Sequence, residues 1–256
     1  MRRIALTVSA CLSLCLIVAA AVQASNVGAV TTESVSFHGK YSKRDRHKTR
    51  GGLSLRTTFS ITDPSAPAPL QLDRTTLRFP KGAVVNGRYF PKCKFTTLQT
   101  KGPRGCPKGS KIGGGTAKGA APPIVDSVAA KVTLFNGVPV GHDPTLLVYV
   151  FPDLGPVITL EGVVKRSTSA NYGYVLSVTV PPIKTLPSAP DAATTFFDAT
   201  VNNLSVKRGK RRINYIDSPV LCNGTYFLLD GAFTYRGGVT HTVYEKFTLN
   251  GGPRCP

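Results

Sequence analysis

Cysteine is the residue type whose placement in this 256-residue chain points most directly to chemistry. Two of the six cysteines, Cys11 and Cys15, fall inside an apolar N-terminal run, and the other four come later. An even number of cysteines behind an export signal indicates structural disulfides formed in an oxidising compartment. The four later cysteines are Cys93, Cys106, Cys222 and Cys255.

Four cysteines can pair in three ways. We expect the two sequence-local pairs, Cys93–Cys106 and Cys222–Cys255, because each would close across a turn. On the loop-entropy model, each bridge stabilises the fold by about 3–4 kcal/mol. The first bridge would hold a short polar loop, and the second would hold the open end of the last hairpin.

The histidines and serines do not form a known catalytic or metal-binding pattern. Neither His-x-x-x-His nor His-Glu-x-x-His occurs, and no Gly-x-Ser-x-Gly element marks a nucleophilic serine. His142-Asp143 and His241 could partner some serine in space, but the sequence alone does not bring them together. We therefore expect no metal ligand and no cofactor. The four histidines are His38, His47, His142 and His241.

Carboxylates give no clear hydrolase signature either. A glycosidase needs paired acids, and two of the three glutamates, Glu161 and Glu245, lie in strand patterns that suit a solvated sheet face. The glycine run from Ile112 to Gly119 lacks the Gly-Lys-Ser/Thr ending of a phosphate loop. We interpret it as a glycine-rich strand or bulge and assign no catalytic residue. Three aspartates could still meet in space, namely Asp153, Asp198 and Asp230.

The first 24 residues have the organisation of a removable export signal. Two arginines at 2–3 precede the charge-free apolar run Ile4–Val22, and Val22-Gln23-Ala24 offers small residues before a cleavage point. We expect cleavage after Ala24 and a location outside the cell or in its envelope. A retained anchor and lipidation at Cys11 are the alternatives. No later apolar run is long enough to span a bilayer.

Alternation of apolar and polar residues predicts strands along the rest of the chain. Leu53–Ile61 is the clearest case, with every second residue apolar. No segment shows a long 3.6-residue apolar period, and 25 glycines and 20 prolines divide the chain into short pieces. The expected strands are Thr32–Phe37, Leu53–Ile61, Thr75–Phe79, Ala130–Phe135, Thr145–Phe151, Val157–Val164, Tyr172–Val180, Phe196–Val206, Arg212–Ile216, Thr225–Tyr235 and Thr240–Leu249.

These patterns predict an all-β fold, a single β-sandwich of Ig-like or jelly-roll-like type with about ten short strands. The sandwich would occupy residues 53–256. It would follow the signal peptide at 1–24 and a basic N-terminal segment at 25–52 that contains one strand. Gly-centred turns are expected at Arg236–Val239 and Lys207–Arg211, each between two strands.

Several segments resemble those of a group of uncharacterised secreted proteins from high-G+C Gram-positive bacteria (actinobacteria). The shared elements are a Leu/Phe-Pro-Lys/x-Gly turn followed by Pro-x-Cys, a Cys-Pro-x-x-Ser-x-Ile-Gly-x-Gly-x-Ala element, a Val-Thr-Leu-Phe-Asn-Gly element and a closing Cys…Phe-x-Tyr-x-x-Gly…Cys pattern. Here they stand at Phe79–Gly82, Cys106–Ala117, Val132–Gly137 and Cys222–Cys255. The resemblance implies a secreted β-rich fold and carries over no functional residue.

The chain is strongly basic, with 32 Lys and Arg against 13 Asp and Glu. Loss of the two signal arginines would lower the formal charge from +19 to +17. Such an excess favours contact with polyanions, although basic turns can also be scattered, solvated charge. The candidate polyanion-binding residues are Lys43, Arg44, Arg46, Lys48, Arg50, Lys207, Arg208, Lys210, Arg211 and Arg212.

We expect a non-enzymatic binding or structural module that contacts anionic cell-wall or membrane-surface polymers through these turns. Nucleic acid is not expected, because export removes the usual target and no aromatic residues are interleaved with the basic runs. One alternative is a secreted hydrolase assembled from distant residues, which needs a concave pocket holding paired carboxylates or a Ser/His/acid cluster. Another is a carrier of a small apolar ligand inside a closed barrel, which needs an apolar cavity.

Overall fold

The computed structural model describes residues 31–41, 50–184, 190–219 and 226–248. These residues are mostly β-strand with one short α-helix, α1 (Phe95–Lys101), so the all-β prediction is confirmed. The strands of the main sheet are β1 (Thr32–Tyr41), β2 (Leu53–Thr62), β3 (Leu72–Pro80), β5 (Lys111–Ala121), β6 (Val125–Asn136), β7 (Thr145–Pro152), β8 (Ile158–Arg166), β9 (Tyr172–Thr179), β10 (Ala193–Val201), β14 (Tyr226–Tyr235) and β15 (Thr240–Thr248).

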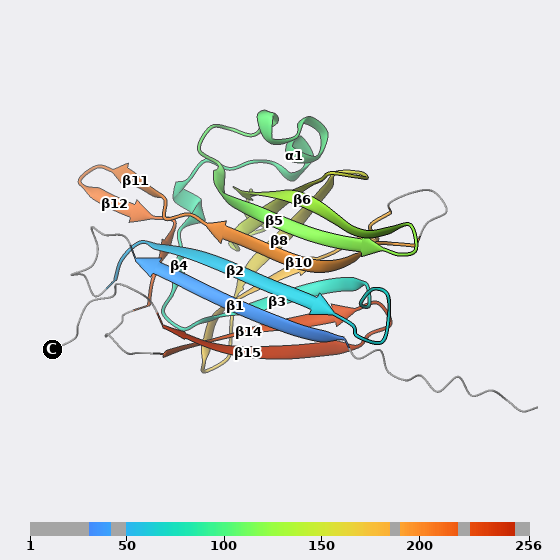
Figure 1. The fold of residues 1–256 in the computed structure, drawn as a ribbon. Helices are drawn as coiled ribbons and strands as arrows, with labels where there is room; N and C mark the ends of the chain where they lie inside the picture. The colour runs from blue at the N-terminus through green and yellow to red at the C-terminus, as the bar shows by residue number, and fades with distance from the viewer. Residues whose placement is uncertain (1–30, 42–49, 185–189, 220–225, 249–256) are drawn as a thin grey trace, which may run out of the picture.

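These eleven strands form one sheet in the order β1-β2-β10-β5-β6-β7-β8-β9-β3-β14-β15 (Figure 1). Each hydrogen-bonded neighbour is antiparallel. The sheet curls until β1 and β15 lie side by side, so it nearly closes into a barrel. With an odd number of alternating strands, the two edge strands must run in the same direction at this seam.

Side chains link the two edge strands at the seam. Glu33 of β1 lies 2.8 Å from the Nδ1 atom of His241 on β15. Four residues further along both strands, the carboxylate of Glu245 accepts a hydrogen bond from the backbone of Phe37. Both contacts join residues 208 positions apart, as a parallel register requires.

The continuous sheet differs from the sandwich expected from the sequence. A sandwich needs two sheets facing each other, whereas here an unbroken series of ladders joins all eleven strands. Alternation identifies the buried face of each strand. It does not tell whether another sheet covers that face or the same sheet curls over it.

Most expected strands are confirmed, and two differences concern the elements that lie beside the barrel. The expected strand Phe196–Val206 is divided into β10 and β11 (Ser205–Arg208), and β11 pairs with β12 (Arg211–Asn214) around Gly209. The segment between Cys93 and Cys106, expected as a short polar loop, contains α1. A second small sheet pairs β4 (Val84–Val85) with β13 (Ile216–Asp217). None of the described helices is long and apolar enough to cross a membrane.

The glycine run is part of β5, as its interpretation as a glycine-rich strand predicts. A Cβ atom at Gly113 or Gly115 would lie 1.9 Å from the carbonyl oxygen of Thr200 or Asp198 on β10. Any side chain there would force β5 and β10 apart. Glycine is therefore needed for the close approach of the two backbones, and no phosphate-binding role is required to explain it.

Candidate functional site

Strand directions send alternate connections to opposite ends of the barrel (Figure 1). Strands β1, β3, β6, β8 and β10 finish at one end, which we call the basic end. Strands β2, β5, β7, β9 and β14 finish at the other, which we call the apolar end. In Figure 1 the basic end is on the left and the apolar end is on the right.

Charge is divided between the two ends. Residues 81–111, which leave β3 and enter β5 at the basic end, include eight Lys or Arg and no acid; α1, in the middle of this segment, lies on the outer side of the sheet against β8 (Figure 1). Residues 202–216 at the same end include five and no acid. At the apolar end, residues 63–73 carry two aspartates and 121–127 carry one, without a base in either. This separation concentrates positive charge at one end of the barrel, although Lys184 and Arg236 lie at the other end and Asp143 lies at the basic one.

Hydrogen bonds join the basic β11–β12 hairpin to the segment that precedes Cys93. The Nη2 atom of Arg208 donates to the carbonyl of Tyr89 at 3.1 Å. Lys92 donates to the carbonyl of Arg88 at 3.1 Å, and the Arg88 guanidinium lies 4.6 Å from the centre of the Tyr89 ring. Cations from two distant parts of the sequence therefore share one surface.

The start of β2 is tied to the same region. Asn203 donates its side-chain amide to the carbonyl of Gly52 at 2.9 Å. The backbone N–H of Ser218 donates to the carbonyl of Gly51 at 3.0 Å. Arg50 precedes these glycines and is exposed, so it lies beside the base of the hairpin.

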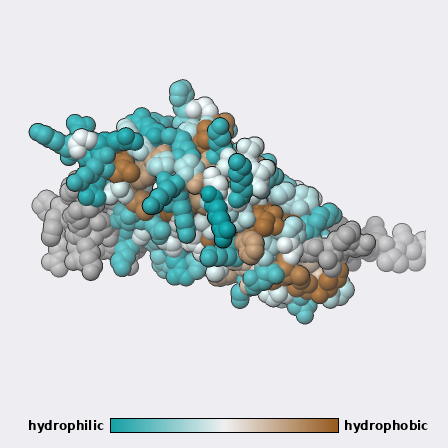
Figure 2. Space-filling model, turned by 90° about the horizontal axis from the view of Figure 1, so that it is seen from above, coloured by the Kyte–Doolittle hydropathy of each residue, from teal (hydrophilic) through white to brown (hydrophobic). Residues whose placement is uncertain are grey.

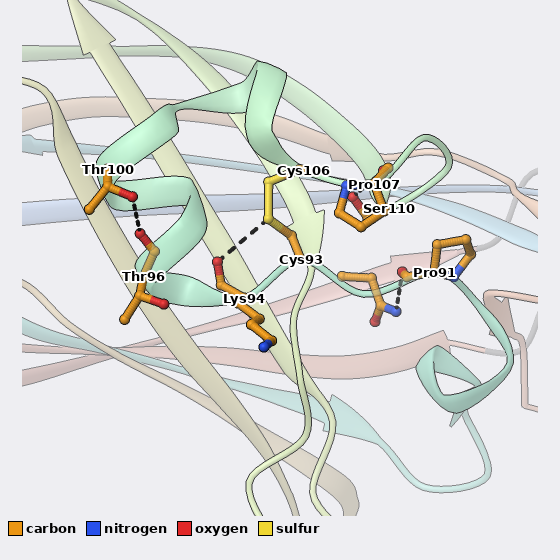
Figure 3. Close-up of a disulfide and its surroundings, with 9 residues drawn as sticks. Pro91, Cys93, Lys94, Thr96, Thr100, Cys106, Pro107 and Ser110 are labelled. Atoms are coloured by element: carbon orange, nitrogen blue, oxygen red, sulfur yellow. Dashed lines mark hydrogen bonds between the residues drawn. A yellow bond between two sulfur atoms is a disulfide. The ribbon is translucent and has the colours of Figure 1, made fainter.

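The Cys93–Cys106 disulfide is present, with Cα atoms 5.0 Å apart, and it encloses α1 and the short turn that follows (Figure 3). The buried Asn136 at the end of β6 holds this segment to the barrel. Its amide nitrogen donates to the carbonyls of Gly87 and Pro91, each at 2.9 Å, and its oxygen accepts from the hydroxyl of Tyr215 at 3.2 Å. The predicted partner bridge, Cys222–Cys255, lies outside the described residues.

The predicted polyanion-binding residues fall into two groups. Lys43, Arg44, Arg46 and Lys48 lie outside the described residues. The described ones are all exposed at the basic end: Arg50, Lys207, Arg208, Lys210, Arg211 and Arg212. Seen from above (Figure 2), long hydrophilic side chains project from the end that carries β11–β12.

Arg88 was missed as a candidate because it lies in neither basic run. The signal that could have identified it is the absence of any acid from residues 81–111. With it, the surface that we call the basic face comprises Arg50, Arg88, Lys92, Lys94, Lys108, Lys111, Lys207, Arg208, Lys210, Arg211 and Arg212. Lys101 and Arg104 flank Gly102, which lies beside Tyr149 of β7, so they belong to the outer side of the barrel under α1 (Figure 1).

The interior of the barrel contains an apolar cavity of about 260 Å³. Side chains from β2, β3, β5 to β10 and β14 line it, and no acid is among them. Several of the lining apolar residues are only half-buried, including Leu146, Val150, Leu160 and Phe197. Such a cavity is what the carrier alternative requires, but no residue pattern locates it in the sequence, because inward-facing alanines are also ordinary core residues.

The aspartates proposed for a hydrolase do not meet one another. Asp198 on β10 accepts from the Nε atom of Arg56 at 2.7 Å, and hydrogen bonds from Arg56 hold the pKa of Asp198 below its usual value. Asp230 accepts from Arg78 at 2.8 Å on a different part of the sheet, and Asp153 is exposed after β7. Within the described ranges, no three His, Cys, Asp or Glu side chains are grouped as a metal site would require.

Burial also raises the pKa of two tyrosines that hydrogen-bond to carboxylates, one to Asp230 and one to Glu33. Tyr172, which shares a hydrogen bond with Asp230, has its pKa raised to about 12, mainly by burial. Burial raises the pKa of Tyr235, which donates its hydroxyl proton to Glu33 at the seam. Both phenols therefore stay protonated at neutral pH and serve as hydrogen-bond donors that link strands.

No known protein-family model, curated protein or solved structure matches the chain. The geometry of the molecule therefore carries the functional argument.

Proposed function

We propose that the protein is a non-enzymatic binding module that contacts anionic polymers of the cell wall or membrane surface through the basic face. The observation that carries this proposal is the placement of separate basic segments at one end of the barrel. Arg208 contacts Tyr89, and Gly52 contacts Asn203, so the basic segments form one surface rather than scattered charge.

The cations of this face are available to an external anion. Among the described residues, none of them forms an ion pair with a carboxylate; the described ion pairs involve Arg56, Arg78, Lys184 and His241. Asp217 is the acid nearest in sequence to the β11–β12 hairpin, and its carboxylate accepts hydrogen bonds from the side-chain amides of Asn86 and Asn214, each at 2.8 Å. An extended polymer with regularly spaced charges can therefore replace bound counterions along the face.

Export to the envelope is part of the proposal. It is supported by the apolar N-terminal run in the sequence and by the Cys93–Cys106 disulfide, which an oxidising compartment favours. The resemblance to secreted proteins of actinobacteria agrees with it. The hydrolase alternative gains no support, because the apolar cavity has no acid in its lining.

The proposal is tested by the salt dependence of binding to a linear anionic probe, end-labelled long-chain polyphosphate. The hairpin triple variant carries Lys207→Gln, Lys210→Gln and Arg211→Gln. It leaves in place Arg208 and Arg212, which make hydrogen bonds inside the fold. If each residue releases about one counterion, the slope of log affinity against log salt should fall in magnitude by about 2–3.

A second triple variant with the same net charge provides the control. It carries Arg74→Gln, Lys118→Gln and Lys131→Gln, three exposed positions on the barrel wall away from the basic face. The slope for this variant should stay close to that of the unmodified protein. Equal losses in the two triples would show that net charge alone matters, and absence of binding at low salt would refute the proposal outright.

A further inference from the structure

The cavity is bounded by unusually small side chains on one side of the barrel. Its lining includes seven alanines on or next to β5, β6 and β10, where larger residues would fill the interior. Across the barrel, β3 and β14 supply bulkier groups such as Leu77 and Leu229. An interior lined by such small side chains leaves space for a bound small molecule. The alanines are Ala117, Ala120, Ala121, Ala130, Ala192, Ala193 and Ala199.

Packed residues close the cavity toward the basic end. Tyr215 and Phe90 meet edge to face with ring centres 5.1 Å apart, and both are buried. The small β4–β13 sheet lies beside them, and Ile216 and Pro219 face the cavity. Asn136 holds this closure through its hydrogen bonds to the turn at Gly87 and to Tyr215.

The apolar end has a different surface. Leu154 lines the cavity and is still 55% exposed. Phe151 and Val157 are also exposed around the β7–β8 turn, and Ile124 is exposed at the tip between β5 and β6. Figure 2 shows hydrophobic patches toward this end of the molecule. Exposed apolar residues that continue into an apolar cavity are typical of the entrance to a ligand site.

We propose that the cavity binds a neutral apolar molecule of about ten carbon atoms, which enters from the apolar end. The size follows from a comparison with an apolar cavity of about 150 Å³ that binds benzene, or about 25 Å³ for each carbon. A cavity of about 260 Å³ then holds about ten. The neutrality follows from the lining, which is apolar except for a few threonines and Tyr174 and Tyr215; Lys118 is the one charged residue among the described residues that line it, and it is exposed to solvent.

The site does not use the cations of the basic face, and its entrance lies at the opposite end of the barrel. A charged head group would find no buried counterion inside the cavity, so burying it would be costly. Uncharged aromatic or alkyl groups can be buried in the cavity without this desolvation cost. The hydrophobic transfer of each buried carbon supplies the affinity.

Naphthalene, with ten carbons, is the probe for this site. Titration of the folded protein, followed by isothermal calorimetry and by thermal unfolding, should give saturable binding at one site and a higher midpoint of unfolding. Benzene should bind more weakly because it buries less apolar surface. Pyrene, which would need about 400 Å³ at the same scale, should not bind.

A pair of neighbouring alanines provides matched variants. Ala130 lines the cavity and Ala129 points outward on the same strand. The variant Ala130→Leu/Ala199→Leu adds six carbons, which would occupy about 150 Å³ of the space. It should weaken naphthalene binding by at least about tenfold, whereas Ala129→Leu should change it by less than about twofold.

The single variant Ala130→Leu keeps the test valid if the double variant does not fold. It should weaken naphthalene binding while its thermal unfolding remains cooperative. Failure of the unmodified protein to bind naphthalene saturably would overturn the proposal. So would an equal loss of binding in Ala129→Leu.

Discussion

Replacement of Asn136 by leucine tests whether one buried amide holds the closure of the barrel at its basic end. Asn136 is 1% exposed, and its side chain connects three separate groups. It donates to the carbonyls of Gly87 and Pro91 and accepts from Tyr215. Leucine has a similar shape and can make none of these hydrogen bonds.

The magnitude follows from the groups that lose a partner. The Gly87 carbonyl keeps one hydrogen bond, from the backbone of Phe90 at 3.1 Å. The Pro91 carbonyl and the Tyr215 hydroxyl would be left unpaired, at about 1–3 kcal/mol each. Burial of the leucine side chain offsets about 1–2 kcal/mol of this. We therefore expect Asn136→Leu to lower the free energy of unfolding by about 2–3 kcal/mol.

The assay is urea denaturation at neutral pH, with Tyr215→Phe as the matched control. That variant removes one hydroxyl and leaves both donations from Asn136 to Gly87 and Pro91 in place, so it should cost about 1 kcal/mol. The reasoning is refuted if Asn136→Leu unfolds within about 1 kcal/mol of the unmodified protein, or if the two variants are equally destabilised.

Three further predictions concern the disulfide and two carboxylates. Replacing Cys93 and Cys106 together by alanine should lower the free energy of unfolding by about 3 kcal/mol, measured by urea denaturation, because the bridge closes a loop with a sequence separation of 13. Asp198→Asn should destabilise the protein at neutral pH; since Arg56 lowers the folded pKa of Asp198, this difference should disappear as pH falls through that folded value. Glu245→Gln should stabilise the protein at neutral pH, because burial raises the folded pKa of Glu245 above 4.5 and makes the ionised form unfavourable in the folded state. The difference in the free energy of unfolding between the variant and the unmodified protein should vanish at a pH below 4.5, where the carboxyl is protonated in both states. A difference that persists at that pH contradicts the explanation.

Local patterns in the sequence were sufficient to predict most strands of the main sheet. Leu53–Ile61 alternates over its whole length and forms β2, and the Gly237–Gly238 turn joins β14 and β15 as expected. The pairing of Cys93 with Cys106 was also predictable, because the two residues lie close in sequence. Each of these features depends on residues within about fifteen positions of one another.

Closure of the sheet depends on contacts that a local pattern does not contain. The neighbours of β10 are β2 and β5, which lie far from it in sequence. The seam contacts join residues 208 positions apart. A sandwich and a nearly closed barrel require the same alternation in each strand, so the sequence alone could not separate them.

For the candidate sites too, the sequence shows the residue types, whereas their arrangement in space depends on contacts between distant residues. The basic runs were visible as residue types, and five members of the 207–212 run are exposed on the hairpin as expected. Their position beside Tyr89 and Arg88 follows from the register of distant strands. The cavity was not predictable, because Ala130 and Ala199 indicate a void only when the strands that carry them are known to face inward around a common axis.

Lysine footprinting with and without polyphosphate tests most directly whether one end of the barrel binds anions. The amines of Lys94, Lys108, Lys111, Lys207 and Lys210 are exposed on the basic face. We predict that polyphosphate protects them from acetylation, as quantified by mass spectrometry. Exposed lysines of the barrel wall, Lys118 and Lys131, should react at an unchanged rate. Uniform protection of all lysines, or protection of the wall lysines alone, would contradict the account.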